Sequence, residues 1–155
     1  PQVRDAVPIP VVAGGGMGDG RGMAAAFMLG AEGVQMGTRF IVADEAVVHE
    51  NYKNKVIAAK DIDTQVTGRS TGHPIRVLKN RMSREYLRLE EEGASFEQLE
   101  QLTVGGLRRA VTEGDVTGGS VMAGQIAGLI KKRQSCREII SEMMEETEKL
   151  LDRRI

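Results

Sequence analysis

Short apolar runs separated by glycine dominate the first forty residues of the chain. Residues 9–13, Ile-Pro-Val-Val-Ala, have no alternating polar partners, which is typical of a parallel strand covered on both faces. Residues 33–37, Gly-Val-Gln-Met-Gly, predict a second strand. Residues 19–29 between them are rich in Ala and Met and have no β-branched residue, so they favour a helix, and Gly30 is placed for a left-handed C-terminal cap. The order predicts one βαβ unit.

A glycine-bearing turn follows each predicted strand. Gly14-Gly15-Gly16 and Gly37-Thr38 both come at the carboxyl ends of neighbouring parallel strands, where α/β folds bind ligands. Glycine lets backbone N–H groups converge on an anion, and we expect the helix opening near Asp19 to add a partial positive charge and the Thr38 hydroxyl to add a donor. The turns therefore indicate a phosphate site. That the glycines only make tight turns is an equally open alternative at this point.

A Rossmann dinucleotide site fits this pattern poorly. No Gly-x-Gly-x-x-Gly can be placed within residues 14–22, and the second strand ends in Thr38-Arg39 without an acidic residue to hold a ribose. In TIM barrels, phosphate sites recur in the loops after the last two strands. The sequence therefore predicts an α/β fold of the TIM (β/α)8 barrel class, of which this chain supplies the last two strands and the carboxyl-terminal helices.

The rest of the chain predicts helices and loops. Residues 44–60 carry acids in the first turn and Lys in the last, as a helix does. Residues 61–76 mix Asp, Thr, Ser and Gly without a period and predict an extended loop, which could cover substrate at the rim of a barrel. Residues 75–89 place apolar side chains along one side of a second helix.

Further helices are expected toward the carboxyl end. Capping-box patterns at Ser95 and Ser135 predict two helix starts, and Gly105-Gly106 predicts a kink or break in the first of them. After Ser135 an apolar stripe follows, made of Ile139, Ile140, Met143, Met144, Leu150 and Leu151. Residues 121–130 predict a helix of small residues that either returns toward the ligand pocket or only packs tightly on the barrel.

The chain does not begin like a complete protein, because it lacks an initiator Met and offers only two convincing strands. A parallel pair buried on both faces needs more sheet beside it. We therefore expect the carboxyl-terminal part of a larger barrel, with the preceding amino-terminal part of the same barrel as its partner. Residues 1–60 would form the last βα units with the phosphate loops, and residues 61–155 a loop and helical region that packs on the barrel.

Composition narrows the possible functions. The 155 residues carry a net charge of −1 and include only three Phe and two Tyr, which argues against nucleic-acid binding. No apolar run is long enough for a membrane span and no signal peptide opens the chain, so we expect a cytoplasmic protein without a membrane partner.

The residue types that most often carry chemistry are few. The single Cys136 cannot form an intramolecular disulfide and is expected to pack. His49 is most simply a surface or capping residue, and Pro74 biases His73 toward an extended structural turn rather than catalysis. No metal site is expected, because these three residues are far apart in sequence.

Several stretches resemble known flavoenzymes. Four stretches resemble the flavin-binding half of the nitronate monooxygenase superfamily, namely residues 11–16, 19–22, 29–31 and 33–40. Three further stretches more narrowly resemble the flavin-dependent (type II) enoyl-ACP reductases of bacterial fatty-acid synthesis, namely residues 72–76, 78–80 and 118–129. The loop at residues 14–18 departs from the more usual Ala-Gly-Gly-Ile-Ala.

The resemblance implies FMN as the cofactor, NADH or NADPH as the co-substrate and an enoyl thioester on acyl carrier protein as the substrate. Reduced nicotinamide would deliver hydride to FMN, and the flavin would pass it to the β-carbon of the thioester. Carried over by position, the phosphate would be held by Gly15, Gly16, Gly37 and Thr38. Gln35 would lie beneath or beside the cofactor, and Ala13 and Gly14 would line the same rim.

The family's catalytic His lies in a Gly-Gly-His motif that this chain does not contain, so no catalytic residue is assigned. A homodimer stays open. Two other functions remain compatible with the sequence. One is a nitronate monooxygenase with the same FMN site, in which dioxygen reoxidises the flavin. The other is a non-catalytic module that binds a nucleotide or sugar phosphate.

Overall fold

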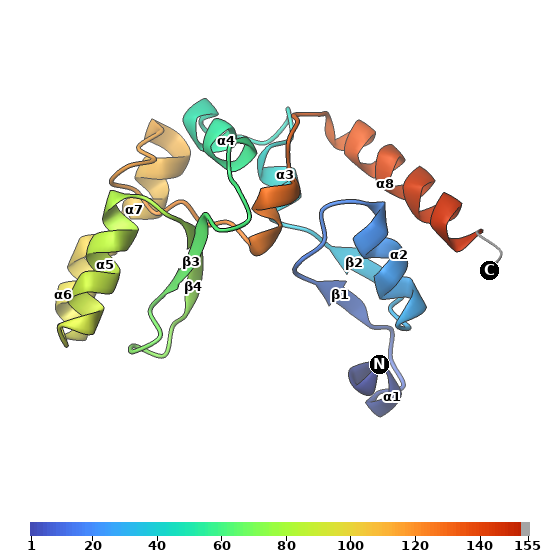
Figure 1. The fold of residues 1–155 in the computed structure, drawn as a ribbon, viewed down its shortest axis with the longest axis horizontal. Helices are drawn as coiled ribbons and strands as arrows, with labels where there is room; N and C mark the ends of the chain where they lie inside the picture. The colour runs from blue at the N-terminus through green and yellow to red at the C-terminus, as the bar shows by residue number, and fades with distance from the viewer. Residues whose placement is uncertain (153–155) are drawn as a thin grey trace.

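The computed structural model describes residues 1–152 and mixes helices with short strands, in agreement with the predicted α/β class (Figure 1). Figure 1 shows two arms joined by a central body. One arm holds α1, β1, β2, α2 and α8, the other holds β3, β4, α5, α6 and α7, and α3, α4 and the 3₁₀ helix η2 lie between them. In chain order the elements are α1 Gln2–Ala6, β1 Val12–Gly14, α2 Gly20–Met28, β2 Gly33–Gln35, α3 Thr38–Ile41, α4 Glu50–Ile57, β3 Thr64–Thr67, β4 Ile75–Leu78, α5 Arg81–Glu91, α6 Phe96–Thr103, α7 Gly106–Arg108, the π-helix η1 Arg109–Glu113, η2 Gln125–Leu129 and α8 Cys136–Leu151.

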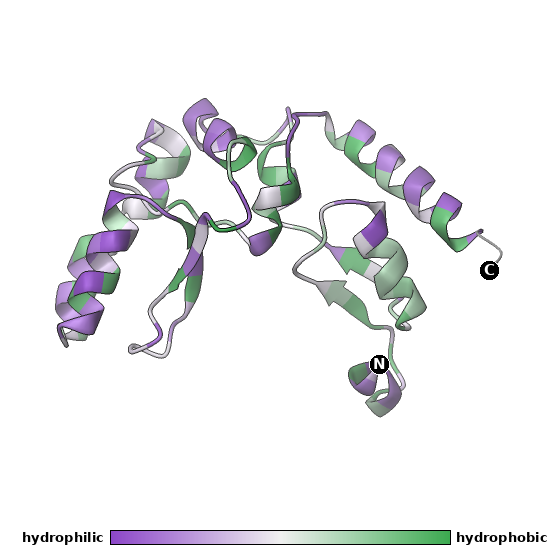
Figure 2. Cartoon of the chain, viewed as in Figure 1, coloured by the Kyte–Doolittle hydropathy of each residue, from purple (hydrophilic) through white to green (hydrophobic). Residues whose placement is uncertain are grey.

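The predicted βαβ unit is confirmed. β1 and β2 pair in parallel, α2 connects them, and Gly30 adopts a left-handed φ of 93° just beyond α2. The expectation that β1 is covered on both faces is wrong for the described residues, since Ile9 and Val12 are exposed. In residues 1–152 β2 is the only strand paired with β1, so the other edge of β1 has no neighbouring strand, although the unit is largely apolar in colour (Figure 2).

A second sheet was not expected from the sequence. β3 and β4 form an antiparallel hairpin, so the predicted loop over residues 61–76 is wrong, as is the helix start at Ile75. Residues 1–152 therefore contain four strands rather than two. Successive side chains of a strand point to opposite faces, and both faces of β4 are covered at its carboxyl end. Val77 and Leu78 are consequently both buried. Their sequence lacks the alternation of polar and apolar residues that marks a strand, so it is interpreted as one side of a helix from the sequence alone.

Asn80 caps the start of helix α5. The Asn80 side chain accepts a hydrogen bond from the Ser83 N–H at 2.8 Å, and the Ser83 hydroxyl accepts one from the Asn80 N–H at 3.0 Å. The same Asn80 amide donates to the carbonyl oxygens of Val116 and Gly119, at 3.0 and 2.7 Å. This buried residue therefore caps a helix and also holds the turn before residue 120.

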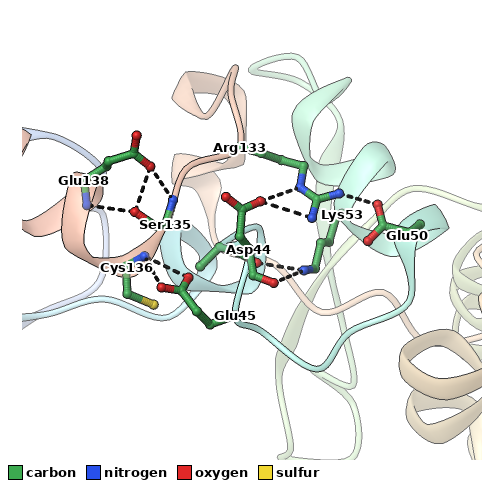
Figure 3. A network of polar contacts seen from close by, with 9 residues as sticks. Asp44, Glu45, Glu50, Lys53, Arg133, Ser135, Cys136 and Glu138 are labelled. Atoms are coloured by element: carbon green, nitrogen blue, oxygen red, sulfur yellow. Dashed lines mark hydrogen bonds and ion pairs between the residues drawn. The ribbon is translucent and has the colours of Figure 1, made fainter.

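The helix predicted over residues 44–60 is shortened to α4. His49 is its N-cap, and its Nδ1 accepts a hydrogen bond from the Asn51 N–H at 3.1 Å, which confirms the capping interpretation of this histidine. The acidic residues before α4, Asp44 and Glu45, lie outside the helix and contact Arg133 and Cys136 instead (Figure 3). Arg133 contacts Asp44 at 3.2 Å, and the Cys136 N–H donates to the Glu45 carboxylate at 2.9 Å.

Lys53 on α4 lies in the same network but is buried (Figure 3). Its Nζ donates to the carbonyl oxygen of Ala43 at 2.7 Å. Exposed ion pairs such as that of Arg133 with Asp44 contribute about 0–1 kcal/mol each, whereas a buried carbonyl left unpaired costs more. The buried lysine therefore fixes the segment between α3 and α4 more firmly than the surface pairs do.

Capping boxes at Ser95 and Ser135 are confirmed as the starts of α6 and α8, and the chain breaks at Gly105, whose φ is 69°. The prediction of a small-residue helix over residues 121–130 is wrong except at η2. Met122 instead forms an antiparallel bridge with Val77. Because the bridge extends the backbone there, helical structure begins only at Gln125.

The largest apolar cluster lies where the two arms meet. It combines residues of α4 and η2 with β4 and the stretch after residue 120, among them Tyr52, Leu78, Val121 and Ala127. Ile139 and Met143 of α8 are buried in a second cluster, while Ile140, Met144 and Leu151 of the predicted stripe are exposed.

Helix α8 returns to the first arm and lies against α2 (Figure 1). A Cβ at Gly20 would be 2.6 Å from Glu146 Cβ and 2.8 Å from the Met143 carbonyl oxygen, so only glycine permits this approach. Part of the region 61–155 thus packs on the region 1–60, and residues 153–155 of it lie outside the described residues. Within residues 1–152 no helix has the length and apolarity needed to cross a membrane.

The double role of Asn80 leads to a stability prediction. Asn80→Ala in the full-length protein should lower the free energy of unfolding by roughly 2–4 kcal/mol, because the cap is lost and two carbonyl oxygens lose their donor. Ser95→Ala removes only an exposed cap and should cost about 1 kcal/mol. Urea unfolding of both variants measures the difference. Equal losses would show that the bonds to residues 116 and 119 contribute nothing.

Candidate functional site

The two glycine-bearing turns emerge side by side. In the parallel pair, Val12 lies opposite Gly33, Ala13 opposite Val34 and Gly14 opposite Gln35. Both strands therefore end at the same level, and the turns that follow them leave the sheet from the same edge. This confirms the expected placement of the turns at neighbouring carboxyl ends.

The backbone of these turns faces open space. Gly15 and Gly16 have φ angles of 88° and 77°, a left-handed conformation that side chains disfavour. No heavy atom lies within 4 Å of an added Cβ at Gly15, Gly16 or Gly37, among the described residues. A ligand can therefore approach the backbone of both turns closely.

Thr38 connects the second turn to a distant part of the chain. Its Oγ1 accepts a hydrogen bond from the Gly124 N–H at 2.9 Å. A Cβ at Gly124 would lie 3.4 Å from that oxygen, which is the near limit of an ordinary van der Waals contact. The Thr38 oxygen is thus already used as an acceptor, in a residue that is only 8% exposed, and donation from its hydroxyl to a ligand stays a prediction.

Helix α2 does not offer a free N-terminus, contrary to expectation. The Gly20 N–H donates to Glu146 Oε2 at 2.7 Å, and the Arg21 N–H donates to Asp19 Oδ1 at 3.0 Å. The hydrogen bond from the Arg21 side chain, together with those from backbone N–H groups, holds the pKa of Asp19 below its usual value. Two carboxylates therefore neutralise the positive end of α2, which leaves the glycine turns as the remaining candidate for an anion.

Gln35 and Ala13 lie on opposite faces of the sheet. Gln35 is exposed on the face of Gly14, where its Oε1 lies 3.8 Å from the position of an added Cβ. The Ala13 side chain instead lines a hollow of about 360 Å³ together with Ala25 and Ala26 of α2. Gln35 can therefore reach a ligand at the strand ends from one face, while Ala13 lines a hollow on the other face that Gly15 and Gly16 also line.

Arg39, next to Thr38, was not singled out from the sequence. It is only 6% exposed, its Nη2 donates to Gln134 Oε1, and its Nη1 has no partner among the described residues. Burial lowers the pKa of Arg39, and the nearby Glu142 carboxylate opposes that shift. The only sequence signal was its place in Gly-Thr-Arg, since the partner lies 95 residues away.

The remaining candidate side chains lie away from the turns. His73 is exposed and meets the Phe96 ring edge-on, with ring centroids 6.4 Å apart. Burial is the largest cause of a raised pKa at the partly buried Cys136 thiol, and the Glu45 carboxylate raises it further. Within residues 1–152 no three His, Cys, Asp or Glu side chains gather in a way that could hold a metal ion.

Comparison with known proteins identifies the family. Residues 1–146 match the family described as nitronate monooxygenase. The chain belongs to this family. FabK from Thermotoga maritima shares 48% identity and superposes with a TM-score of 0.93, over 97% of this chain and 48% of its own. A nitroalkane oxidase from Streptomyces ansochromogenes shares 31% identity with a TM-score of 0.75, over 96% of this chain and 42% of its own.

A curated relative gives the same family. A probable nitronate monooxygenase from Staphylococcus saprophyticus is 34% identical over 99% of this chain and 43% of its own length. The chain therefore spans somewhat under half the length of the curated relatives that it matches.

The contact between Thr38 and Gly124 can be tested by itself. Thr38→Val keeps the branched shape but removes the acceptor, so the full-length protein should lose about 1–3 kcal/mol of unfolding free energy. Thr38→Ser keeps the hydroxyl and should lose clearly less. Chemical denaturation of the protein without added ligand measures both. A Val variant as stable as the Ser variant would contradict the importance of this hydrogen bond.

Proposed function

We propose that the whole protein is an FMN-dependent oxidoreductase that reduces the carbon-carbon double bond of enoyl-ACP thioesters with NADH or NADPH, in fatty-acid biosynthesis. The observation that carries the proposal is the likeness to FabK, an FMN-dependent enoyl-ACP reductase. That likeness has a TM-score of 0.93 and 48% identity, against 0.75 and 31% for the nitroalkane oxidase. The narrower sequence resemblance to type II reductases points the same way.

The turns fit the phosphate of FMN. The open backbone at Gly15, Gly16 and Gly37 would place N–H groups around the phosphate oxygens, and the Thr38 hydroxyl would donate a further hydrogen bond. Gln35 would lie beside the cofactor from the adjoining strand end. Ala13 and Gly14 would line the same rim.

The chain's part in the reaction is to bind and to orient. When bound, FMN would accept a hydride from reduced nicotinamide and return it to the β-carbon of the enoyl thioester. The glycine turns would hold the phosphate end, and the segment tied to Thr38 through Gly124 would fix the neighbouring arm relative to it. We assign no catalytic residue to this chain.

We further infer that the chain forms the carboxyl-terminal part of a TIM barrel, with residues 1–60 as its last βα units and residues 61–155 as the region that packs on it. Its match to about half the length of its relatives supports this placement. The barrel's amino-terminal part and acyl carrier protein would then be its partners. Carrier-bound substrate would place the enzyme in the cytoplasm, and a homodimer is compatible with this arrangement.

A nitronate monooxygenase is the second candidate, because the curated relatives carry that name. Anaerobic titration of the full-length protein separates the two. We expect NADH to bleach the flavin and crotonyl thioester to restore its colour without oxygen. Bleaching by a nitronate, with colour restored only by dioxygen, would favour the monooxygenase. A protein that binds phosphate ligands but shows no flavin spectrum would favour a non-catalytic module.

The cofactor assignment predicts a loss of flavin in Gly37→Val. The position has open space and a φ of −96°, so the fold should tolerate the branched side chain, which would instead meet the phosphate. Loss of one hydrogen bond to a charged group costs about 1.5–3 kcal/mol, so the Kd for FMN should rise at least roughly tenfold.

The matched control is Gly33→Ala at the start of β2, where an added Cβ makes an ordinary 3.7 Å contact with Val12. It should keep its flavin. Absorbance of the purified, folded proteins measures flavin content. Undiminished flavin content in Gly37→Val would contradict the assignment of this turn to the FMN phosphate.

The capping role of His49 predicts that it takes no part in flavin reduction. His49→Asn keeps a side-chain acceptor for the Asn51 N–H, so α4 should stay capped. Stopped-flow mixing with NADH should give a rate within about twofold of the unchanged protein. A folded variant that NADH no longer reduces would mean that the histidine belongs to the chemistry.

A further inference from the structure

The stretch from Val121 to Gly124 lies along β4 as an extended segment. The Leu78 N–H donates to the Val121 carbonyl oxygen at 2.8 Å, and the Ala123 N–H donates to the Arg76 carbonyl oxygen at 3.2 Å. In an extended chain the backbone N–H and C=O groups of successive residues point to opposite edges. Val121 and Ala123 therefore face β4, and the residue after each of them faces away from it.

Two buried side-chain hydroxyls take the backbone bonds of that outer edge. The Tyr52 hydroxyl on α4 donates to the Met122 carbonyl oxygen at 2.7 Å, and the Gly124 N–H donates to the Thr38 hydroxyl oxygen at 2.9 Å. Tyr52 is 2% exposed and Thr38 is 8% exposed, so water cannot readily replace either bond. The segment is thus fixed to α4 at one residue and joined to the residue beside the proposed phosphate turn two residues later.

Helix α4 also holds the other side of the contact between Gly124 and Thr38. Lys53 directly follows Tyr52, is likewise 2% exposed, and donates from Nζ to the Ala43 carbonyl oxygen at 2.7 Å. Ala43 comes two residues after the end of α3, whose first residue is Thr38. Figure 1 shows α4 beside α3 and η2 in the central body. Two adjacent buried residues of α4 therefore set where Thr38 and Gly124 meet.

The hydroxyl of Tyr52 keeps its hydrogen over a wide range of pH. Burial raises the pKa of Tyr52 to about 12, although the hydrogen bond to Met122 opposes that shift. The neutral phenol is the form that can donate, so the bond to the Met122 carbonyl persists in any assay near neutral pH.

We propose that Tyr52 and Lys53 are positioning residues for the phosphate of FMN. They act through the segment after residue 121 and through α3, and so decide how the Thr38 hydroxyl is oriented. A hydroxyl that accepts one hydrogen bond from a fixed N–H can donate only in the remaining directions, so its orientation determines whether it reaches the phosphate. This inference rests on the proposed cofactor site and adds the residues that set its geometry.

The test measures the Kd of FMN for apoprotein prepared from the full-length protein, by quenching of flavin fluorescence. Tyr52→Phe removes one oxygen atom and keeps the buried ring, and the Kd should rise roughly three- to tenfold. The control is Tyr86→Phe on α5. Tyr86 is also buried, at 8% exposed, and packs against Met82 and Leu99, but its hydroxyl forms no hydrogen bond within residues 1–152, so the Kd should not change.

Lys53→Met supplies a second variant from the same helix. Methionine fills a similar space but cannot donate to the Ala43 carbonyl, so the Kd should again rise at least about threefold. Far-UV circular dichroism checks that each apoprotein is folded before the titration. With two variants that disturb opposite sides of the contact, the inference can be contradicted even where one of them does not fold.

A double-mutant cycle separates positioning from stability. Thr38→Val removes the hydroxyl through which α4 acts, so adding Tyr52→Phe to it should raise the Kd by less than about twofold more. A merely structural Tyr52 would lower the urea midpoint of the apoprotein and leave the Kd for FMN unchanged. That result would overturn the inference, as would the same fold-change of Tyr52→Phe with and without the Thr38 hydroxyl.

Failure of the proposed function gives different results. The affinity for FMN is measured without substrate, so a flavin that crotonyl thioester cannot reoxidise would reject the reductase and leave the roles of Tyr52 and Lys53 intact. A full-length protein that binds no FMN would reject the cofactor site, and the inference with it.

Discussion

The hydrogen bond from the Gly124 N–H to the Thr38 hydroxyl oxygen is one of the contacts that join the two arms of the molecule. Thr38 begins α3, directly after the turn that follows β2, whereas Gly124 ends the stretch that bridges β4 through Met122. The apolar cluster around Tyr52 and Val121 joins the same parts, because it combines residues of α4, β4 and η2. The geometry of the glycine turns and the placement of the second arm are therefore set together.

The start of the nearest long helix, α2, is already occupied by carboxylates of the chain itself. Carboxylates of Asp19 and Glu146 already take the first N–H groups of α2, so the helix dipole is neutralised from within the chain. Arg39 places a buried guanidinium one residue after Thr38, and its charge is incompletely paired among the described residues. Its guanidinium is held by Gln134 and lies near the Glu142 carboxylate, so this charge is offset by an acid on α8.

Local signals in the sequence were sufficient for part of the fold. The βαβ unit, the two serine capping boxes, the break at Gly105 and the cap at His49 each depend on residues within a few positions of one another. The sequence did not predict the β3–β4 hairpin, because Val77 and Leu78 on opposite faces of β4 are both buried and the alternation that identifies a strand is lost. Arg39 and Gly124 could not be interpreted either, because their partners lie 95 and 86 residues away. Long-range contacts decide which side chains meet at the turns, and no local pattern encodes them.

Backbone N–H groups hold a phosphate in the same way whatever the second substrate is, so the glycine turns cannot by themselves distinguish one activity of the family from another. Discrimination requires side chains that contact the part of the substrate that differs. The second arm is tied to the turn by the hydrogen bond from the Gly124 N–H to the Thr38 hydroxyl, which fixes where the side chains of that arm stand relative to the turns.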